Sequence, residues 1–420
     1  MQFPTLAGAW LGAYYVVLLL LAVYGIHRLV IVALYQFGRS SAPGDLNTMK
    51  EWPQVTVQLP LFNELYVAER LLKAAADIDY PAECLEIQVL DDSTDGTYGI
   101  VARTVAELRR GGVAINHLHR TDRQGFKAGA LASGLSSARG EFICVFDADF
   151  LPPRDLLKRS LPHFGSPEVG MVQARWTHLN RDYSLLTKIQ AFALDFHFIL
   201  EQTGRNFGRH FINFNGTAGI WRKECILDAG NWSGETLTED LDLSYRAQLK
   251  KWKFKYLEDV ETPAELPVVI SAARSQQFRW NKGAAENFRK NYRKLVKDPS
   301  VSFGTKFHGF FHLLNSSMFL IVLLLGILSV PVLYIKNNNP MFSWYFNVLA
   351  GFGISTIIFF FCYYVPYTKI YGKGIKSFFN FIGMFITFYL KAYGVGASLV
   401  WLESAAFQSL ICWIMSTSVF

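Results

Sequence analysis

The feature that most constrains this chain is the separation of apolar from charged residues along its sequence. Residues 7–26 form an apolar run without a charged side chain, and His27 and Arg28 follow it directly. About twenty apolar residues are needed to cross the hydrocarbon core of a bilayer. A cleaved signal peptide would carry basic residues before the run and a small-residue cleavage site after it. Residues 1–36 are therefore predicted to be a retained transmembrane anchor.

A second apolar region extends from residue 307 to residue 420 and is predicted to hold about four transmembrane helices. Basic residues prefer the cytoplasmic side of a membrane, so Lys369, Lys373 and Lys376 predict a cytoplasmic connection between the second and third of these helices. The basic flank of the first run places the domain that follows it on the same side. The predicted helices are residues 313–335, 344–367, 378–402 and 405–420.

Between these apolar regions, residues 52–299 have the pattern of a soluble α/β domain. Short β-rich apolar runs alternate with segments of helical spacing, which predicts a mostly parallel, doubly wound sheet. In such sheets the ligand site lies at the carboxyl ends of the strands. The predicted strands are 56–59, 87–90, 114–118 and 142–146, and the predicted helices are 68–76, 97–109 and 127–137.

The formal charge of +7, from 41 Lys and Arg against 34 Asp and Glu, suits a phosphate-bearing ligand, anionic lipid or nucleic acid. The basic residues do not cluster, which disfavours nucleic acid. The five cysteines lie far apart with no CxxC pair and no neighbouring His, so they indicate neither a zinc site nor a disulfide framework.

Two acidic segments follow predicted strands. Asp91 and Asp92 lie on a loop whose side chains can accept hydrogen bonds from a base and a ribose, or simply form an Asp-rich turn that caps a helix. After strand 142–146, the alternate spacing of Asp147 and Asp149 lets both carboxylates approach one Mg²⁺ or Mn²⁺ ion. Short acidic pairs are also common where loops begin. The pair Asp147 and Asp149 gains weight because it follows a predicted apolar strand in the same domain as Asp91 and Asp92.

Lys127 lies near the start of the predicted helix 127–137, between the two acidic segments. The amides of a helix N-terminus can meet phosphate oxygens, and a lysine there would clamp the phosphate. The alternative is a solvated lysine, but a positive charge at that end is unfavourable with respect to the helix dipole. The mismatch favours a functional role.

Asp240 and Glu239 precede an apolar helical stretch, 241–249. They are either acidic first-turn residues after an N-cap threonine or the source of a base that removes a proton from a hydroxyl group. Farther along, Arg279 and Trp280 place a planar cation beside an indole. This pair can bind a diphosphate and stack on a sugar, or it can be core filler or a membrane-interface anchor.

In this order and at these separations, the motifs resemble those of processive family 2 glycosyltransferases, the group that includes cellulose, chitin and hyaluronan synthases. The chain is most similar to the cellulose synthase-like mannan and glucomannan synthases. The resemblance implies a nucleotide-diphospho-sugar transferase fold of the GT-A type. It rests on residues 125–131 (GFKAGAL), 146–150 (FDADF), 172–176 (VQARW), 214–222 (FNGTAGIWR) and 276–280 (QQFRW).

The resemblance also implies a role for each candidate residue. Asp240 is the expected general base and Glu239 its orienting neighbour, while Trp280 is expected to stack on the terminal sugar of the acceptor. The expected donor-binding residues are Asp91, Asp92, Lys127, Asp147, Gln276 and Arg279, and the expected metal ligands are Asp149 and Asp147.

The implied protein is an inverting, metal-dependent hexosyltransferase embedded in the plasma or Golgi membrane by several spans, with its catalytic domain in the cytosol. With Mg²⁺ or Mn²⁺ it would polymerise β-1,4-mannan or glucomannan from GDP-mannose, or a β-glucan from UDP-glucose. Its partners would be the nucleotide sugar, the polysaccharide acceptor and the lipid bilayer, without nucleic acid. The alternatives are a non-processive glycosyltransferase that makes a glycolipid and a membrane transporter or scaffold with a degenerate domain.

Overall fold

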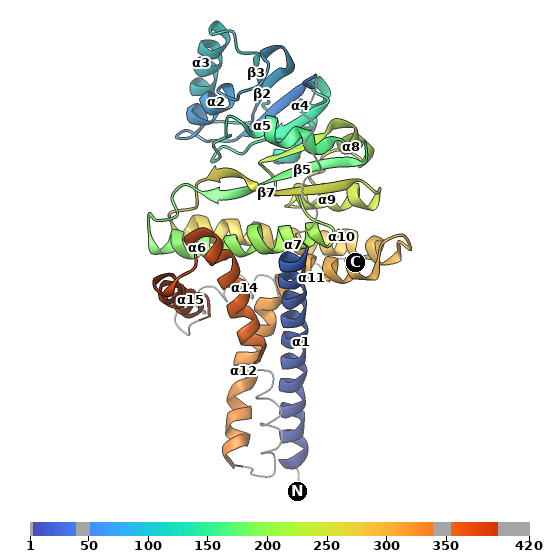
Figure 1. Cartoon of the computed structure of the whole chain (residues 1–420), viewed down its shortest axis with the longest axis vertical. Coiled ribbons are helices and arrows are strands. Elements are labelled where there is room, and N and C mark those ends of the chain that lie inside the picture. Colours follow the sequence, from blue (N-terminus) through green and yellow to red (C-terminus); the bar gives the residue numbers. More distant parts are fainter. Residues whose placement is uncertain (1–2, 39–50, 339–353, 394–420) are drawn as a thin grey trace.

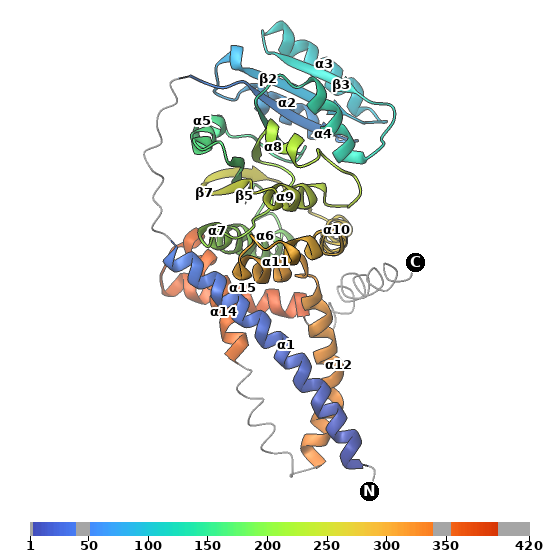
Figure 2. The ribbon, with the colours of Figure 1, turned by 90° about the vertical axis from the view of Figure 1, so that its right-hand side faces the viewer.

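The computed structural model describes residues 3–38, 51–338 and 354–393 of the 420-residue chain. An α/β unit stands on a layer of helices, and long helices descend from that layer on its other side (Figure 1). The layer contains α6 (Leu185–Asp195), α7 (Gln202–Phe207), α10 (Ile270–Lys297) and α11 (Phe303–Leu313). Figure 2 shows it edge-on, between the sheet above and α1 below.

The α/β unit is built on a seven-stranded sheet of order β3-β2-β1-β4-β6-β5-β7. The predicted parallel arrangement is confirmed for its first half, because β1 pairs in parallel with β2 and β4, and β2 with β3. Strand β6 is antiparallel to both of its neighbours, and β5 pairs in parallel with β7. The strands are β1 Val55–Leu61, β2 Leu85–Asp91, β3 Ile115–His119, β4 Phe142–Val145, β5 Val169–His178, β6 Gly219–Arg222 and β7 Lys253–Ala264.

The sheet separates two apolar cores, as a strand buried on both faces requires. Along β4, Phe142 and Cys144 face one core, while Ile143 and Val145 face the other, because successive side chains of a strand alternate. The first core contains residues of α2, α3 and α5, and the second contains residues of α4, α8 and α9. These helices are α2 Ala68–Ala76, α3 Thr97–Arg110, α4 Phe126–Ser137, α5 Leu156–Ser160, α8 Lys223–Asp228 and α9 Glu239–Leu249.

The helices predicted at 68–76, 97–109 and 127–137 agree with α2, α3 and α4 to within one residue. The first four strands also lie where they are predicted, with ends shifted by one or two residues. The remaining helices of the α/β unit and the layer beneath it are short. They are η1 Ala82–Cys84, η2 Leu161–Phe164 and the π-helical η3 Phe196–Glu201.

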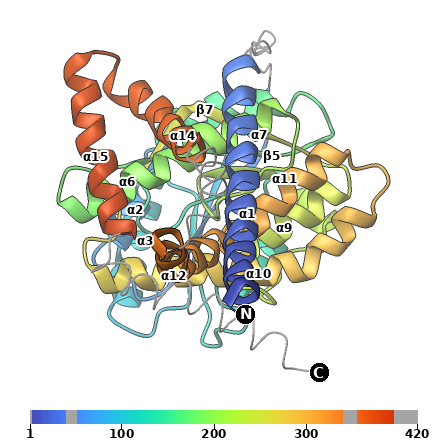
Figure 3. The same cartoon turned by 90° about the horizontal axis from the view of Figure 1, so that it is seen from below.

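In the part of the chain that the structure describes, four apolar helices lie below the layer, and Figure 3 shows them from beneath. Within the described ranges, the segment Leu6–Phe37 is the one long and apolar enough to cross a membrane, and the shorter segments Leu320–Lys336 and Ile375–Phe388 are also apolar. The other predicted spans remain predictions, and residues 344–353 and 394–420 of those spans lie outside the described part of the chain. The four helices are α1 Phe3–Phe37, α12 Ser317–Asn338, α14 Ile354–Tyr371 and α15 Ile375–Tyr393.

His27 and Arg28 do not flank the first apolar helix but lie inside α1, where both are buried. Arg28 forms an ion pair with Glu201 of η3, and its Nη2 donates to Asn315 Oδ1 at 2.7 Å. The imidazoles of His27 and His308 of α11 are 3.0 Å apart, Nε2 to Nδ1. The polar residues after the apolar run therefore join α1 to the helix layer.

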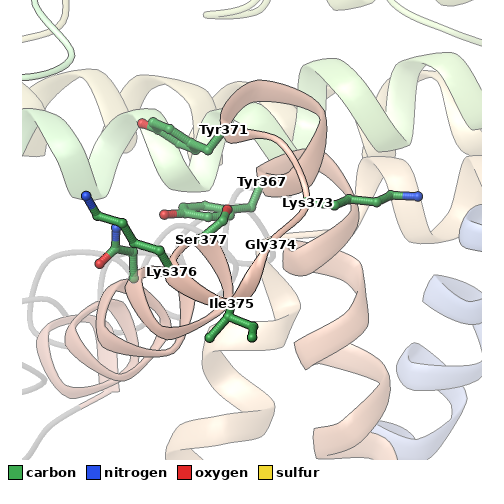
Figure 4. A pocket seen from close by; sticks show the side chains of 8 residues that line it. Tyr367, Tyr371, Lys373, Gly374, Ile375, Lys376 and Ser377 are labelled. Atoms are coloured by element: carbon green, nitrogen blue, oxygen red, sulfur yellow. The ribbon is translucent and has the colours of Figure 1, made fainter.

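A pocket of about 410 Å³ lies at the turn between α14 and α15 (Figure 4). In this view the side chains of Lys373 and Lys376 extend to opposite sides of the turn. None of the candidate residues of the predicted site lines this pocket. The lining residues are Tyr367, Tyr371, Lys373, Gly374, Ile375, Lys376, Ser377 and Asn380.

Candidate active site

Lys127 is the hub of the candidate site. Its Nζ lies 2.5 Å from Asp147 Oδ1 and 3.8 Å from Glu239 Oε1, and it donates to the Gly216 carbonyl oxygen at 2.9 Å. Burial lowers the pKa of Lys127, but the charges of Asp147 and Glu239 outweigh burial and raise it above its ordinary value. One charged lysine thus joins the loop after β4 to the start of α9.

The backbone before Lys127 is shaped by glycines. Gly125 has φ +74°, a left-handed conformation that favours glycine, and it precedes the first residue of α4. A Cβ at Gly129 would lie 2.0 Å from the Gln124 carbonyl oxygen, and a Cβ at Gly234 would lie 3.0 Å from the Gly125 Cα. The glycines therefore let α4 pack against the residue that leads into it and let the loop at Gly234 pack against Gly125.

Asp147 and Asp149 follow β4, as predicted. The Asp147 amide donates to Thr217 Oγ1 at 2.9 Å, which fixes the loop beside residue 216. Burial, reinforced by the charge of Asp147, raises the pKa of Asp149 to about 7. Because the charge of Asp147 opposes the ionisation of Asp149, the pair suits a hard divalent cation, which would relieve the repulsion and prefers oxygen ligands.

Asp240 and Glu239 open α9 and face the same lysine. Burial and the charge of Glu239 raise the pKa of Asp240 to about 7. Gly216 lies against both Asp240 and Lys127. It has φ +82°, and a Cβ there would lie 3.1 Å from Asp240 Oδ2 and 3.4 Å from Lys127 Nζ. The candidate base is therefore held next to the candidate phosphate-binding lysine.

Gln173 of β5 supports the loop that carries Gly216, a role that the sequence did not reveal. Its Nε2 donates to the carbonyl oxygens of Thr217 and Ala218 at 3.0 Å, and its Oε1 accepts from the Asn215 amide at 3.0 Å. Gln173 is fully buried. A buried polar side chain that satisfies three backbone groups holds the loop in one conformation.

Helix α10 is fastened to the start of α9. The Asn287 side chain donates to Thr238 Oγ1 at 3.0 Å, and Gly283 lies so close to Thr238 that a Cβ would come within 2.4 Å of its Oγ1. Asp242 is buried and accepts from Asn291 of α10 at 3.0 Å, and Lys290 lies 3.1 Å from the same carboxylate.

Gln276, Arg279 and Trp280 all lie on α10, within two turns of Gly283. Arg279 is exposed, and the other two side chains are half-buried. Across the described residues, no hydrogen bond or ion pair links these three side chains to Asp147, Asp149 or Asp240. The contacts of Gly283 and Asn287 bring α10 to the site. Within the described ranges, the side chains of Gln276, Arg279 and Trp280 lie on this helix without bonding to the carboxylates of the site.

Asp91 and Asp92 are both buried and already have protein partners. Arg120 binds Asp92 through two atoms, Nε to Oδ1 at 2.7 Å and Nη2 to Oδ2 at 2.5 Å. Asp91 accepts from the Ser93 amide at 2.9 Å and lies 2.9 Å from His117 Nε2. Burial alone would raise the pKa of Asp91, but the His117 and Ser93 hydrogen bonds lower it below its ordinary value.

Sequence reasoning missed Arg120 and His117. Two signals were available, because Arg120 directly follows β3 and His117 alternates with His119 along that strand. Both positions reach the carboxyl ends of β2 and β3, where the sheet topology predicts a ligand site.

Taken together, the loop after β4 carries two carboxylates suited to a divalent cation, α4 carries a lysine suited to phosphate, and the start of α9 carries a candidate carboxylate base beside that lysine. This set can neutralise a departing diphosphate while a base takes a proton from an acceptor. The profile of the family described as "Glycosyltransferase like family 2" matches residues 53–283 of the chain. The chain belongs to this family. The predicted resemblance is thereby confirmed, and the α/β unit is a glycosyltransferase fold of the GT-A type.

Curated relatives of this family-2 chain include glucomannan 4-beta-mannosyltransferases of plants. Glucomannan 4-beta-mannosyltransferase 2 of Arabidopsis thaliana is 43% identical over 262 residues, which cover 61% of this chain and 49% of the relative. Glucomannan 4-beta-mannosyltransferase 1 of Oryza sativa subsp. japonica is 40% identical over 262 residues, covering 61% and 50%. The chain thus spans about half the length of the curated relatives it matches.

A solved structure shares the fold of this family-2 chain. It is a mannosyltransferase from Pyrobaculum calidifontis in complex with GDP-Man and Mn2+, with a TM-score of 0.59 and 20% sequence identity. The alignment covers 84% of this chain and 97% of that chain. At this identity the likeness establishes the fold alone.

Proposed function

We propose that this protein is an inverting mannosyltransferase that transfers mannose from GDP-mannose to a growing β-1,4-mannan or glucomannan. The observation that carries the proposal is the position of Lys127, between Asp147 of the β4 loop and Glu239 of α9. A lysine held between a cation-binding loop and a base can bind the diphosphate of a nucleotide sugar. The plant relatives named as mannosyltransferases direct the choice of sugar.

In this proposal Asp147 and Asp149 would hold Mn²⁺ or Mg²⁺, which would supply charge neutralisation for the leaving diphosphate. Lys127, which contacts Asp147, would bind the same diphosphate. Asp240 accepts the proton of the acceptor hydroxyl as that oxygen attacks the anomeric carbon, and direct displacement converts an α-linked donor into a β-linked product. Glu239 shares Lys127 with Asp147 and so holds the lysine beside the base.

Helix α10 is proposed to form the acceptor side of the site. Trp280 would stack on the terminal sugar through its half-buried ring, while Gln276 and Arg279 would contact the diphosphate. Gly283 sets the distance of this helix from Thr238 and thus from Asp240. Asp91 and Asp92 are proposed to contact the nucleotide, in agreement with their place at the carboxyl end of β2.

The proposed arrangement in the cell is a multi-pass membrane protein with its transferase domain, residues 52–299, in the cytosol. Residues 1–36 would be the N-terminal anchor, and about four spans would follow within residues 307–420. The apolar segment Leu6–Phe37 supports the first part of this plan.

The test is transfer of radiolabelled sugar by the purified full chain in detergent with Mn²⁺ or Mg²⁺. GDP-mannose, GDP-glucose and UDP-glucose are offered separately, and the product is extracted with organic solvent and digested with β-mannanase or β-glucanase. We expect β-mannanase-sensitive polymer from GDP-mannose with the wild type and none with Asp240→Asn. Asp182→Asn, an exposed carboxylate outside the site, is the matched control.

Label from UDP-glucose in a β-glucanase-sensitive polymer would replace mannose with glucose as the sugar. Label found only in the organic extract would overturn the polymer assignment and favour a non-processive enzyme that makes a glycolipid.

A further inference from the structure

A second cluster of ligand atoms lies at the edge of the sheet, at the ends of β2 and β3. Asp91 Oδ2 is 2.9 Å from His117 Nε2 and 3.7 Å from His119 Nδ1. One ligand atom from each of the three residues lies within 4.8 Å of the other two. Of these three residues, Asp91 alone has a role in the proposed transfer reaction, and the two imidazoles have none.

The sheet explains why these atoms meet. His117 and His119 are two residues apart on β3, so their side chains leave the same face of the sheet. Asp91 ends β2 directly opposite His119 in the parallel register. Strand β3 is the edge of the sheet, and the His119 side chain keeps 30% of its surface exposed, so an ion can enter from solvent.

The donor set indicates which ion would bind. Two imidazoles and one carboxylate suit Zn²⁺, whereas Mg²⁺ prefers oxygen ligands. Ligands about 2.0–2.2 Å from a tetrahedral zinc lie roughly 3.4 Å from one another. The observed separations of 2.9 and 3.7 Å bracket this value, so small side-chain rotations would complete a three-ligand site with one open position.

Neighbouring groups already orient the three ligands. The Ser93 amide donates to Asp91 Oδ1, which leaves Oδ2 toward the histidines. The ring of Tyr98 packs against both imidazoles, with centroid distances of 5.3 Å to His117 and 4.7 Å to His119. Hydrogen bonds such as the one from Ser93 fix ligand orientation in metal sites, and the Tyr98 ring limits the movement of the two imidazoles.

We propose that Asp91, His117 and His119 form a Zn²⁺ site and that zinc bound there competes with the donor nucleotide. The site is separate from Asp147 and Asp149, because β2 and β4 flank β1 and two strand spacings amount to about 10 Å. Zinc and the nucleotide would compete because the ion would bind Asp91 Oδ2, and Asp91 is also the proposed contact of the nucleotide. This second part rests on the proposed contact between Asp91 and the nucleotide.

Binding is tested with Co²⁺, whose visible absorption reports imidazole and carboxylate ligands. The purified full chain is titrated with Co²⁺ in excess Mg²⁺, which occupies oxygen-only sites, and Zn²⁺ is then added to displace the cobalt. We expect one equivalent of displaceable Co²⁺ with the wild type. The His117→Ala and His119→Ala variants should lose the absorption, while His163→Ala, a histidine outside the cluster, should keep it.

Competition is tested by measuring the apparent Kd for GDP with and without Zn²⁺. The zinc concentration is ten times the Kd of the protein for zinc. Simple competition predicts a weakening of about tenfold in the wild type and less than about twofold in His119→Ala. Chelation of zinc by GDP is the same in both proteins and cancels in the comparison. Thermal unfolding of each variant checks that it is folded.

Unchanged Co²⁺ binding in both histidine variants would overturn the site, and an unchanged apparent Kd for GDP would overturn the competition. Neither measurement needs sugar transfer, so failure of the proposed mannosyltransferase activity would be seen separately in the radiolabel assay.

Discussion

The two ends of the candidate site differ in how their charges are balanced. At the ends of β2 and β3, Asp92 is matched by Arg120 and Asp91 by His117 and the Ser93 amide. Around Lys127, by contrast, four carboxylates gather about one cation. They are Asp147, Asp149, Glu239 and Asp240.

The two ends therefore differ in whether the protein alone provides partners for the carboxylates. At the first end, folding itself supplies partners for both carboxylates, and the hydrogen bonds from His117 and Ser93 lower the pKa of Asp91. At the second end, burial raises the pKa of Asp149 and Asp240 to about 7, and the neighbouring carboxylates Asp147 and Glu239 add to the effect. A divalent cation would offset this negative charge, and in the proposed reaction it would bind together with the donor.

The largest expected effect that tests this contrast is the loss of the proposed base, Asp240. Asp240→Asn should lower the transfer rate by about 10²–10⁴-fold, because a positioned general base contributes that much. The Kd for GDP should change less than about twofold, since the amide keeps the shape of the carboxylate. Stopped assays and GDP binding measure the two quantities, with Asp182→Asn as control. An equal loss of GDP binding would place Asp240 among the donor-binding residues.

Removal of divalent metal should have the next largest effect. A chelator should reduce transfer at least about a hundredfold, because a metal ion contributes several kcal/mol of charge stabilisation, and Mn²⁺ or Mg²⁺ should restore the activity. The thermal unfolding midpoint of the donor-free protein should change little, because the cation is proposed to bind together with the donor. Transfer that continues in chelator would show that Asp147 and Asp149 act without a metal.

Arg120→Ala tests the end whose charges are balanced. The change leaves the buried Asp92 without its partner, and loss of one member of a buried pair costs about 3–5 kcal/mol. Because Arg120 is 20% exposed, we expect about 2 kcal/mol here, or a fall in unfolding midpoint of about 4–8 °C. Arg139→Ala, which removes an exposed partner of Glu86, should move the midpoint by less than about 2 °C.

The smallest expected effect concerns the fastening of α10 to α9 by Asp242. Burial would raise the pKa of Asp242, but Arg246, Asn291 and Lys290 together lower it below its ordinary value. A depressed pKa stabilises the fold above the unfolded pKa of about 3.9, and that stability is lost as pH falls through the folded pKa. Below about pH 4 the unfolding midpoint of the wild type should therefore fall more steeply than that of Asp242→Asn. Parallel slopes would remove Asp242 from this role.

Local patterns were sufficient for the elements that carry the site. The apolar runs ending before Asp91 and before Asp147 predicted β2 and β4, and the helical spacing after Gly125 predicted α4. Parallel strands end on one side of a sheet, so the start of α4 and the loop after β4 can meet there, although the contact between Lys127 and Asp147 was not itself predicted. The structure joins them at 2.5 Å.

Residues whose role depends on a distant partner were not predictable in the same way. Gln173 satisfies the backbone near Thr217 only after β5 has been placed beside β6. Asn287 lies within a polar stretch of α10 that looks solvated in sequence, yet it is fully buried against Thr238. Each partner lies more than forty residues away, so no local pattern could reveal it.

The sequence by itself determined the alternation of strands and helices, the apolar first helix and the residue types able to bind a diphosphate and a cation, because these follow from periodicity and side-chain chemistry. The tertiary structure decided which charges are neutralised. It paired Asp92 with Arg120 and gathered Glu239 and Asp240 around Lys127. The physical reason is that the energy of a charge depends on its burial and its neighbours within a few ångströms, and folding sets both.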